Sequence, residues 1–244
     1  MAQKKPLTSV ERGRRLAYDY RVVMAMAAQT KIFALTAFRT VDDMEANRRP
    51  ITTEADAHEA AVYRVDYYLR TLIGRGTYTD RVQVYINLLA GNNYPYTPPV
   101  SYQLSKPTLW NPHFHATFPY CDGNIWEPGD GQVLLAHYVI HQIKAINFAD
   151  LQYQPDNYVG WNESAVKYWK RDMKRQPITP GLAYPTIPVE LTHSLSTQES
   201  IQSAFQIVEE VGIAPVPVGG VTIIDQPTAA PTGAVQIIAT GGAG

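Results

Sequence analysis

The chain begins with a pattern of apolar residues that predicts a helix. Between Glu11 and Thr40, apolar residues recur at steps of three and four positions: Leu16, Tyr20, Val23, Met24, Ala27 and Ala28. This spacing is typical of an amphipathic helix that lays one apolar stripe on a core. The polar stretch from Val41 to Glu59 contains Asn47-Arg48-Arg49-Pro50 and predicts a loop, with room for a short helix.

Alternating apolar and polar residues follow and predict strands. Residues 63–73 alternate with a period of two, residues 74–76 read Gly-Arg-Gly, and residues 82–88 alternate again. Two such runs on either side of a turn predict an antiparallel hairpin. Residues 100–104 add a third strand. We therefore expect an antiparallel β-meander.

Helical spacing returns after the strands. It covers residues 132–147 and resumes after Asn162-Glu163, in a helix that we expect to end before Pro177. Beyond Gln176 the chain is rich in proline. Within that part we expect one helix and two short β segments, over residues 197–211, 221–224 and 235–238. The pattern predicts an α+β domain over residues 1–176 and a Pro-rich extension over residues 177–244.

Composition narrows the class of protein. The chain has 244 residues, of which 45% are hydrophobic and 18% charged, and its formal net charge is -1. These values fit a soluble globular protein and give no electrostatic reason to expect nucleic acid as a partner. The start of the chain lacks the apolar core of a secretory signal, and no segment has the roughly 18 apolar residues of a membrane span. We expect a cytoplasmic protein that binds neither nucleic acid nor membrane.

Cys121 is the only cysteine, so it forms no disulfide within the chain. It is either a small buried hydrophobic residue or a thiol kept for its reactivity. The segment from Trp110 to Trp126 brings it together with His113, His115 and several aromatic residues, in an irregular stretch between a strand and a helix. Irregular segments on a rigid scaffold commonly carry catalytic groups. This favours the reactive thiol.

The order of these features resembles the ubiquitin-conjugating (UBC-like) family over residues 11–175. The Tyr-Pro-x-x-Pro-Pro signature of that family matches Pro95, Pro98 and Pro99. Its His-Pro-Asn tripeptide ends about eight residues before the catalytic cysteine. Here Asn111-Pro112-His113 ends eight residues before Cys121. The resemblance implies a UBC-like fold: an N-terminal helix, an antiparallel meander, an active-site loop and C-terminal helices.

The same resemblance implies an activity and partners. Cys121 would accept a ubiquitin-like protein as a thioester from an activating enzyme and pass it to an amine of an acceptor protein. The first helix, with Arg12, Arg14 and Arg15, is the face that the family offers to the activating enzyme; a solvated basic face is the alternative. Cys121 to Trp126 and Pro128-Gly129 are similar to bacterial members of the family, some of which are encoded in antiviral defence operons.

The resemblance also suggests roles around the thiol. The tripeptide's asparagine braces the active-site loop in the family and is proposed to stabilise the oxyanion. His113 occupies that place here, and Asn111 can share the task. Asp156 falls where the family has the residue that helps the incoming lysine lose its proton, whereas Asn157 could only orient it. For Asp156 a helix cap before Tyr158 is an equal alternative.

Other residues receive plainer interpretations. His113 and His115, taken singly, are more often loop or core histidines than catalytic groups. Trp126 is expected to pack under the active-site loop. His137 and His141 lie four residues apart on a predicted helix, a spacing that permits shared metal binding. Since no further ligand is evident, we expect neither metal nor cofactor.

Two rival functions and the extension stay open. One rival is a catalytically inactive variant that only binds a ubiquitin-like protein, although such variants typically lack the cysteine. The other is a cysteine hydrolase that uses Cys121 with His113 or His115. The Pro-rich extension can pack back on the domain, recruit a partner or support a dimer.

Overall fold

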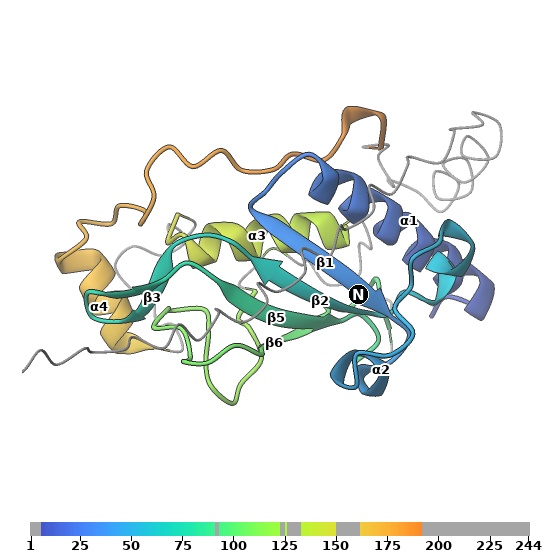
Figure 1. Ribbon diagram of the computed structural model, residues 1–244, viewed down its shortest axis with the longest axis horizontal. Coiled ribbons are helices and arrows are strands. Elements are labelled where there is room, and N and C mark those ends of the chain that lie inside the picture. The colour runs from blue at the N-terminus through green and yellow to red at the C-terminus, as the bar shows by residue number, and fades with distance from the viewer. Residues whose placement is uncertain (1–5, 91–92, 123–124, 126–132, 150–161, 192–244) are drawn as a thin grey trace, which may run out of the picture.

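The computed structural model describes residues 6–90, 93–122, 125, 133–149 and 162–191 (Figure 1). Together they form an α+β structure in which helices cover one face of an antiparallel sheet. The elements, in chain order, are α1 (Ser9–Ala28), β1 (Phe33–Phe38), α2 (Val41–Glu45), η1 (Glu54–Glu59), β2 (Val62–Tyr67), β3 (Thr71–Gly74), β4 (Thr77–Thr79), β5 (Val82–Asn87), β6 (Val100–Gln103), α3 (Leu135–Ile146), α4 (Glu163–Arg171) and η2 (Val189–Leu191). No helix in the described ranges has the length and apolar character needed to cross a bilayer.

The first helix begins and ends at identifiable signals. Thr8 Oγ1 accepts from the backbone N–H of Glu11 at 3.2 Å, and the Glu11 carboxylate accepts from the N–H of Thr8 at 2.8 Å, which is a capping box. The helix ends at Ala28, so the prediction that it extends towards Thr40 is wrong. Residues 33–38 instead form β1, because they pair along their whole length with β2. That tertiary pairing overrides the local helical spacing.

The main sheet has the order β1-β2-β5-β6, with every neighbouring pair antiparallel. The predicted pairing of the two alternating runs and the predicted third strand are confirmed by β2, β5 and β6. The single strand predicted over residues 63–73 is wrong, because the chain leaves the sheet after Tyr67 and forms a separate hairpin of β3 and β4. Gly76 takes a positive φ of 72° in the tight turn of that hairpin, a conformation that glycine adopts without strain.

One face of the sheet is buried beneath α1 and α3 (Figure 1). Tyr63, Val65 and Val84 point to this face and are fully buried, whereas Arg64 between them is half-buried on the other face. Tyr67 on the same face donates to Gln142 Oε1 of α3 at 2.6 Å. The period of two in the sequence thus corresponds to one face packed on helices.

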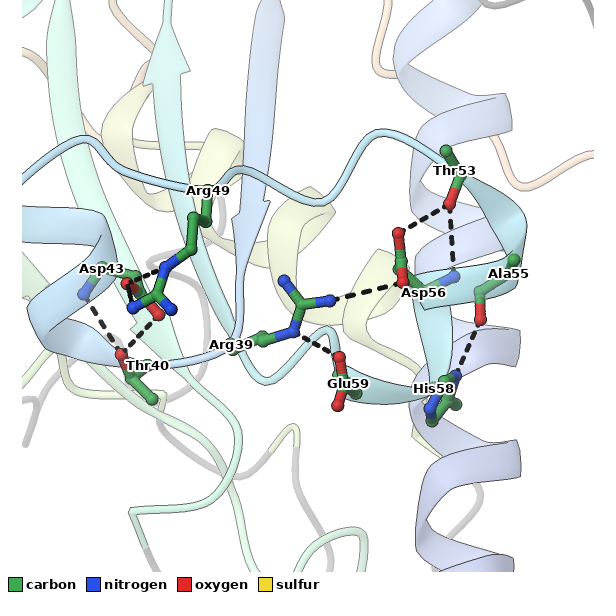
Figure 2. Close-up of polar contacts among 9 residues, drawn as sticks. All are labelled: Arg39, Thr40, Asp43, Arg49, Thr53, Ala55, Asp56, His58 and Glu59. Atoms are coloured by element: carbon green, nitrogen blue, oxygen red, sulfur yellow. Dashed lines mark hydrogen bonds and ion pairs between the residues drawn. The ribbon is translucent and has the colours of Figure 1, made fainter.

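The connection between β1 and β2 is structured by caps and ion pairs (Figure 2). It contains α2 and η1, so the predicted loop does include a short helix. Thr40 and Thr53 cap these two elements through their side-chain oxygens. Arg39 forms ion pairs with Asp56 at 3.3 Å and with Glu59. These contacts fold the connection back beside α1.

The later helices follow the sequence prediction. α3 and α4 lie within the predicted ranges, and Asn162 caps α4 by accepting from the N–H of Ala165 at 3.1 Å. The described part of the Pro-rich extension, residues 177–191, packs back on the domain: Thr179 N–H donates to Asn147 Oδ1 at 2.8 Å, and the Tyr18 hydroxyl donates to the carbonyl of Leu191. The helix and β segments predicted beyond residue 196 lie outside the described residues.

A buried ion pair joins α1 to the start of α3. Arg15 Nε donates to Asp19 Oδ2 at 2.6 Å, and both side chains are almost completely buried. The Asp19 carboxylate also accepts from the Tyr94 hydroxyl at 2.5 Å and from the N–H of Leu135 at 2.9 Å. Arg15 Nη2 reaches the carbonyl of Val133 at 2.6 Å. Burial is the largest single influence and lowers the pKa of Arg15, but the charges and hydrogen bonds of Asp19 and Tyr94 together raise it more, so the guanidinium stays charged.

Candidate active site

Asn111 connects the segment after β6 to the end of α3. Its side chain is fully buried, and Nδ2 donates to the carbonyl of Ala145 at 2.8 Å. Its Oδ1 accepts from the backbone N–H of His113 at 2.9 Å. The amide therefore uses both a donor and an acceptor to fix an irregular stretch against a helix, which gives buried backbone groups the partners they need.

His113 in turn holds Cys121. Its ring is buried, and Nδ1 lies 2.7 Å from the carbonyl oxygen of Cys121, while the N–H of Cys121 donates to the carbonyl of His113 at 3.0 Å. A carbonyl oxygen can only accept, so Nδ1 carries the proton in this contact. The eight-residue spacing therefore closes a loop whose two ends are hydrogen-bonded to each other.

Cys121 itself is partly exposed. It is a free cysteine and only half-buried as a residue, so it does not belong to the hydrophobic core. Asp122, next to it, is also half-buried, and burial raises the pKa of its carboxyl to about 6, with a backbone hydrogen bond opposing the rise. Since this pKa lies above the usual value near 4, ionisation of Asp122 destabilises the folded state. The stabilisation by the protonated carboxyl is complete below pH about 4 and is lost as the pH rises through about 6.

Tyr120 fixes the residue on the other side of the thiol. Its N–H donates to the carbonyl of Ser101 in β6 at 2.7 Å, and its hydroxyl lies 2.7 Å from His141 Nδ1 of α3. Its ring packs against Phe114, with the ring centroids 4.8 Å apart. Burial raises the pKa of Tyr120 well above 10, so the hydroxyl stays neutral at physiological pH.

His115 has a local structural role in the contacts that the structure gives it. Its Nδ1 accepts from the N–H of Thr117 at 3.1 Å and of Phe118 at 3.3 Å, which shapes the turn leading back to Cys121. Phe118 is half exposed on this turn, with its ring 4.7 Å from that of His115. The turn thus presents an aromatic side chain to solvent a few residues from the thiol.

The remaining predicted residues divide into two groups. Trp126, Asp156 and Asn157 lie outside the described residues. On α1, Arg14 is exposed and Arg12 half-buried, but Arg15 is buried and bonded to Asp19. The prediction that Arg15 belongs to an exposed basic face is therefore wrong, because position 15 faces the core beside Leu16 and a charged residue there requires a buried partner.

Sequence reasoning missed Tyr120, Asp122 and the buried polar side chains of α3. His141 and Gln142 interrupt an otherwise apolar helical stripe, and both are buried. Gln142 Nε2 donates to Ser101 Oγ at 2.9 Å. Adjacent polar residues on the core side of a helix are the signal that could have revealed this network, since buried polar groups require partners. His137 and His141, whose spacing permits shared metal binding although we expect no metal there, have other contacts: His137 Nδ1 accepts from the N–H of Leu134, and His141 Nδ1 faces the Tyr120 hydroxyl.

In this arrangement the backbone N–H and carbonyl of the cysteine are both held by hydrogen bonds. The loop offers a partly exposed cysteine on a braced backbone, with a carboxyl group beside it, and this suits the formation of a covalent acyl intermediate. No known family model matches the chain, and no curated protein shows significant sequence similarity to it. The assignment of an activity therefore depends on the residues and their geometry.

Proposed function

We propose that this protein is a ubiquitin-conjugating-type enzyme with a UBC-like fold, which carries a ubiquitin-like protein as a thioester on Cys121. The observation that carries the proposal is the half-buried Cys121, the only cysteine, whose N–H and carbonyl are both bonded to His113. Asn111 then fixes the backbone of His113 to α3. The tripeptide and the eight-residue spacing thus have a physical reason: they close and brace the loop that carries the nucleophile.

The order of elements supports the same proposal. An N-terminal helix, a four-stranded antiparallel meander, a loop that carries the cysteine and later helices follow one another along the chain. The Tyr-Pro signature lies between β5 and β6, and Tyr94 of that signature donates to Asp19 of α1. In this chain the signature fixes the meander to the first helix.

The chemistry consists of two acyl transfers without a redox step. In loading, the Cys121 thiol loses its proton and its sulfur attacks the activating enzyme's thioester, so a new S–C bond forms, the old S–C bond breaks and the released thiolate takes up a proton. In transfer, an acceptor amine attacks the carbonyl, an N–C bond forms, the bond to Cys121 breaks, and the amine gives up a proton. Asp156 is our proposed acceptor of that proton.

The geometry bears on the rival functions. A cysteine hydrolase requires a histidine nitrogen directed at the thiol. Here the contacts of His113 and His115 involve Nδ1, which in a hydrolase is the nitrogen held by the orienting group, so the assay below distinguishes a hydrolase from a conjugating enzyme. A binding module without activity has no need for a partly exposed cysteine on a doubly braced loop. The braced loop therefore favours an enzyme over a binding module.

The decisive experiment is a thioester assay. The full chain is incubated with ATP and with the activating enzyme and ubiquitin-like protein encoded nearest to its gene. We expect an adduct on Cys121 that a thiol reductant removes. Cys121→Ala should abolish the adduct, and Cys121→Ser should give an ester that resists the reductant.

The controls separate the three functions. A binding module would retain the ubiquitin-like protein without forming any covalent adduct, and a hydrolase would cleave small ester substrates without ATP. Absence of a reductant-sensitive adduct, with the activating enzyme itself charged, would rule out the conjugating activity. Arg14→Glu and, as a control, Arg48→Glu, at an exposed position in the β1–β2 connection, test whether loading uses the exposed side of α1.

A further inference from the structure

The geometry points to His141 as a positioning residue that fixes Cys121 through the hydroxyl of Tyr120. This inference deepens the proposed function and rests on it, because it concerns the same thiol. His141 does not touch the reacting atoms in the contacts described. Its hydrogen bond goes to Tyr120, the residue that precedes the nucleophile.

Tyr120 is fixed at three points. Its N–H bonds to Ser101 of β6, its ring packs edge-on against Tyr138 and closely against Phe114, and its hydroxyl bonds to His141 at 2.7 Å. The first two contacts constrain the backbone and the plane of the ring. The hydrogen bond of the hydroxyl fixes how deeply the Tyr120 side chain inserts into the core. Because Tyr120 directly precedes Cys121, this also limits the movement of the Cys121 backbone.

His141 lies on a rigid element, so its hydrogen bond holds Tyr120 in a fixed position. It lies in the middle of α3 and is buried, and its neighbour Gln142 is bonded both to Tyr67 of β2 and to Ser101 of β6. Ser101 therefore accepts from α3 through its side chain and from Tyr120 through its carbonyl. One turn of α3 thus fixes the sheet edge and the residue before the nucleophile together.

Bracing on the two sides of the thiol is complementary. His113 holds the carbonyl of Cys121, on the C-terminal side of its Cα, and His141 holds Tyr120, the residue on the N-terminal side. Both histidines are buried, and their rings meet edge to face with centroids 5.8 Å apart. A reacting group displaced by about 1 Å can lose about 100-fold in rate. Loss of either brace should therefore reduce transfer more than it reduces folding.

The test compares two pairs of variants in the full chain. His141→Leu removes the hydrogen bond and keeps the volume roughly constant, whereas His141→Asn places a polar atom near the position of Nδ1. Tyr120→Phe removes only the hydroxyl, and Tyr63→Phe removes a hydroxyl that is equally buried in the same core but far from the thiol in sequence. Hydrogen exchange of the Tyr120 and Cys121 amides reports the position of the loop without any partner protein.

We expect His141→Leu and Tyr120→Phe to raise amide exchange at residues 120 and 121 by about 10-fold or more, relative to amides of β2, because the loop opens locally. His141→Asn should return exchange to within about threefold of the wild type, since the bond is restored. Tyr63→Phe should leave both amides unchanged. The rate of single-turnover loading of Cys121 should fall in His141→Leu and Tyr120→Phe, recover in His141→Asn and stay unchanged in Tyr63→Phe.

The outcomes are separable. Unchanged exchange at residues 120 and 121 in His141→Leu overturns the positioning inference, whatever the loading assay gives. Equal exchange in His141→Leu and His141→Asn also overturns it, because a merely space-filling role would not distinguish them. A wild-type chain that never loads, with exchange changing as described, refutes the proposed conjugating activity and leaves the positioning of the thiol in place.

Discussion

Two ion pairs with the same sequence separation and the same nitrogen–oxygen distance test how burial determines the contribution of an ion pair to stability. Arg15–Asp19 and Lys167–Glu163 both span four residues on a helix and both have a nitrogen–oxygen distance of 2.6 Å. The first pair has side chains 3% and 0% exposed, and the second has side chains 72% and 71% exposed. The sequence separation and the distance are matched, and the effect of reversing the order of the two charges along a helix is only a few tenths of a kcal/mol, so a large difference between neutralising variants reports the environment.

The expected magnitude follows from the partners of Asp19. Asp19→Asn keeps the shape but leaves the guanidinium of Arg15 buried without its counter-charge, and breaking a buried pair in this way costs about 3–5 kcal/mol. Domains of this size unfold with about 5–15 kcal/mol, so a large fraction of the stability is lost. Glu163→Gln should leave stability unchanged within error, because water screens the exposed pair.

Urea unfolding measures the change in stability of both variants, Asp19→Asn and Glu163→Gln. With a slope of about 1–3 kcal/mol per molar urea, a loss of about 3–5 kcal/mol in Asp19→Asn should lower the midpoint by roughly 1–5 M. Adding Arg15→Met should recover most of the loss, since the orphan charge is gone and the amide introduced at position 19 can still bond to Tyr94 and Leu135. If Asp19→Asn shifts the midpoint no more than Glu163→Gln does, the argument from burial is refuted.

Three further predictions concern single side chains. Tyr63 and Tyr67 are both fully buried on β2; among the described residues the hydroxyl of Tyr67 has a hydrogen-bond partner and that of Tyr63 has none. In urea unfolding, Tyr67→Phe should therefore lower the free energy of unfolding by about 1–2 kcal/mol, and Tyr63→Phe should leave it unchanged or raise it. Asp122→Asn should raise the melting temperature at pH 7.5 and leave it unchanged at pH 4, because the wild-type carboxyl with its pKa of about 6 is protonated at the lower pH. Asn111→Ala should lower stability by about 1–3 kcal/mol and slow thioester loading at least about 10-fold, as calorimetry and single-turnover assays would show.

The sequence predicted the elements that have a strong period or a clear cap. β2, β5 and α3 were found because one face of each is apolar at a regular spacing. β1 was missed because Phe33 to Phe38 continues an apolar run that also fits a helix, and only its pairing with β2 decides between the two. Local periodicity contains no information on that partner.

The candidate site was predicted only in part, for a similar reason. Cys121 and His113 stand out in the irregular segment of the sequence, the role of Asn111 was implied by the family resemblance, and the structure joins the three residues by hydrogen bonds. The contact of Tyr120 with His141 joins residues 21 positions apart and depends on how α3 lies against the sheet edge. Arg15 was assigned to the surface because charge favours exposure, and the buried carboxylate of Asp19 reversed that preference.

The placement of these polar groups explains how an irregular loop can hold a nucleophile still. Such a loop has no regular ladder of its own, so its backbone groups must find partners elsewhere. In addition, α3 holds side chains of the loop at two levels: the carbonyl of Ala145 accepts from Asn111 Nδ2 near the end of the helix, and His141 Nδ1 bonds to the Tyr120 hydroxyl one turn earlier. Both contacts come from one rigid element, and the N–H of Tyr120 is bonded to β6 as well, so each end of the loop is fixed to a regular element. Cutting either contact should therefore loosen the end of the loop that it holds.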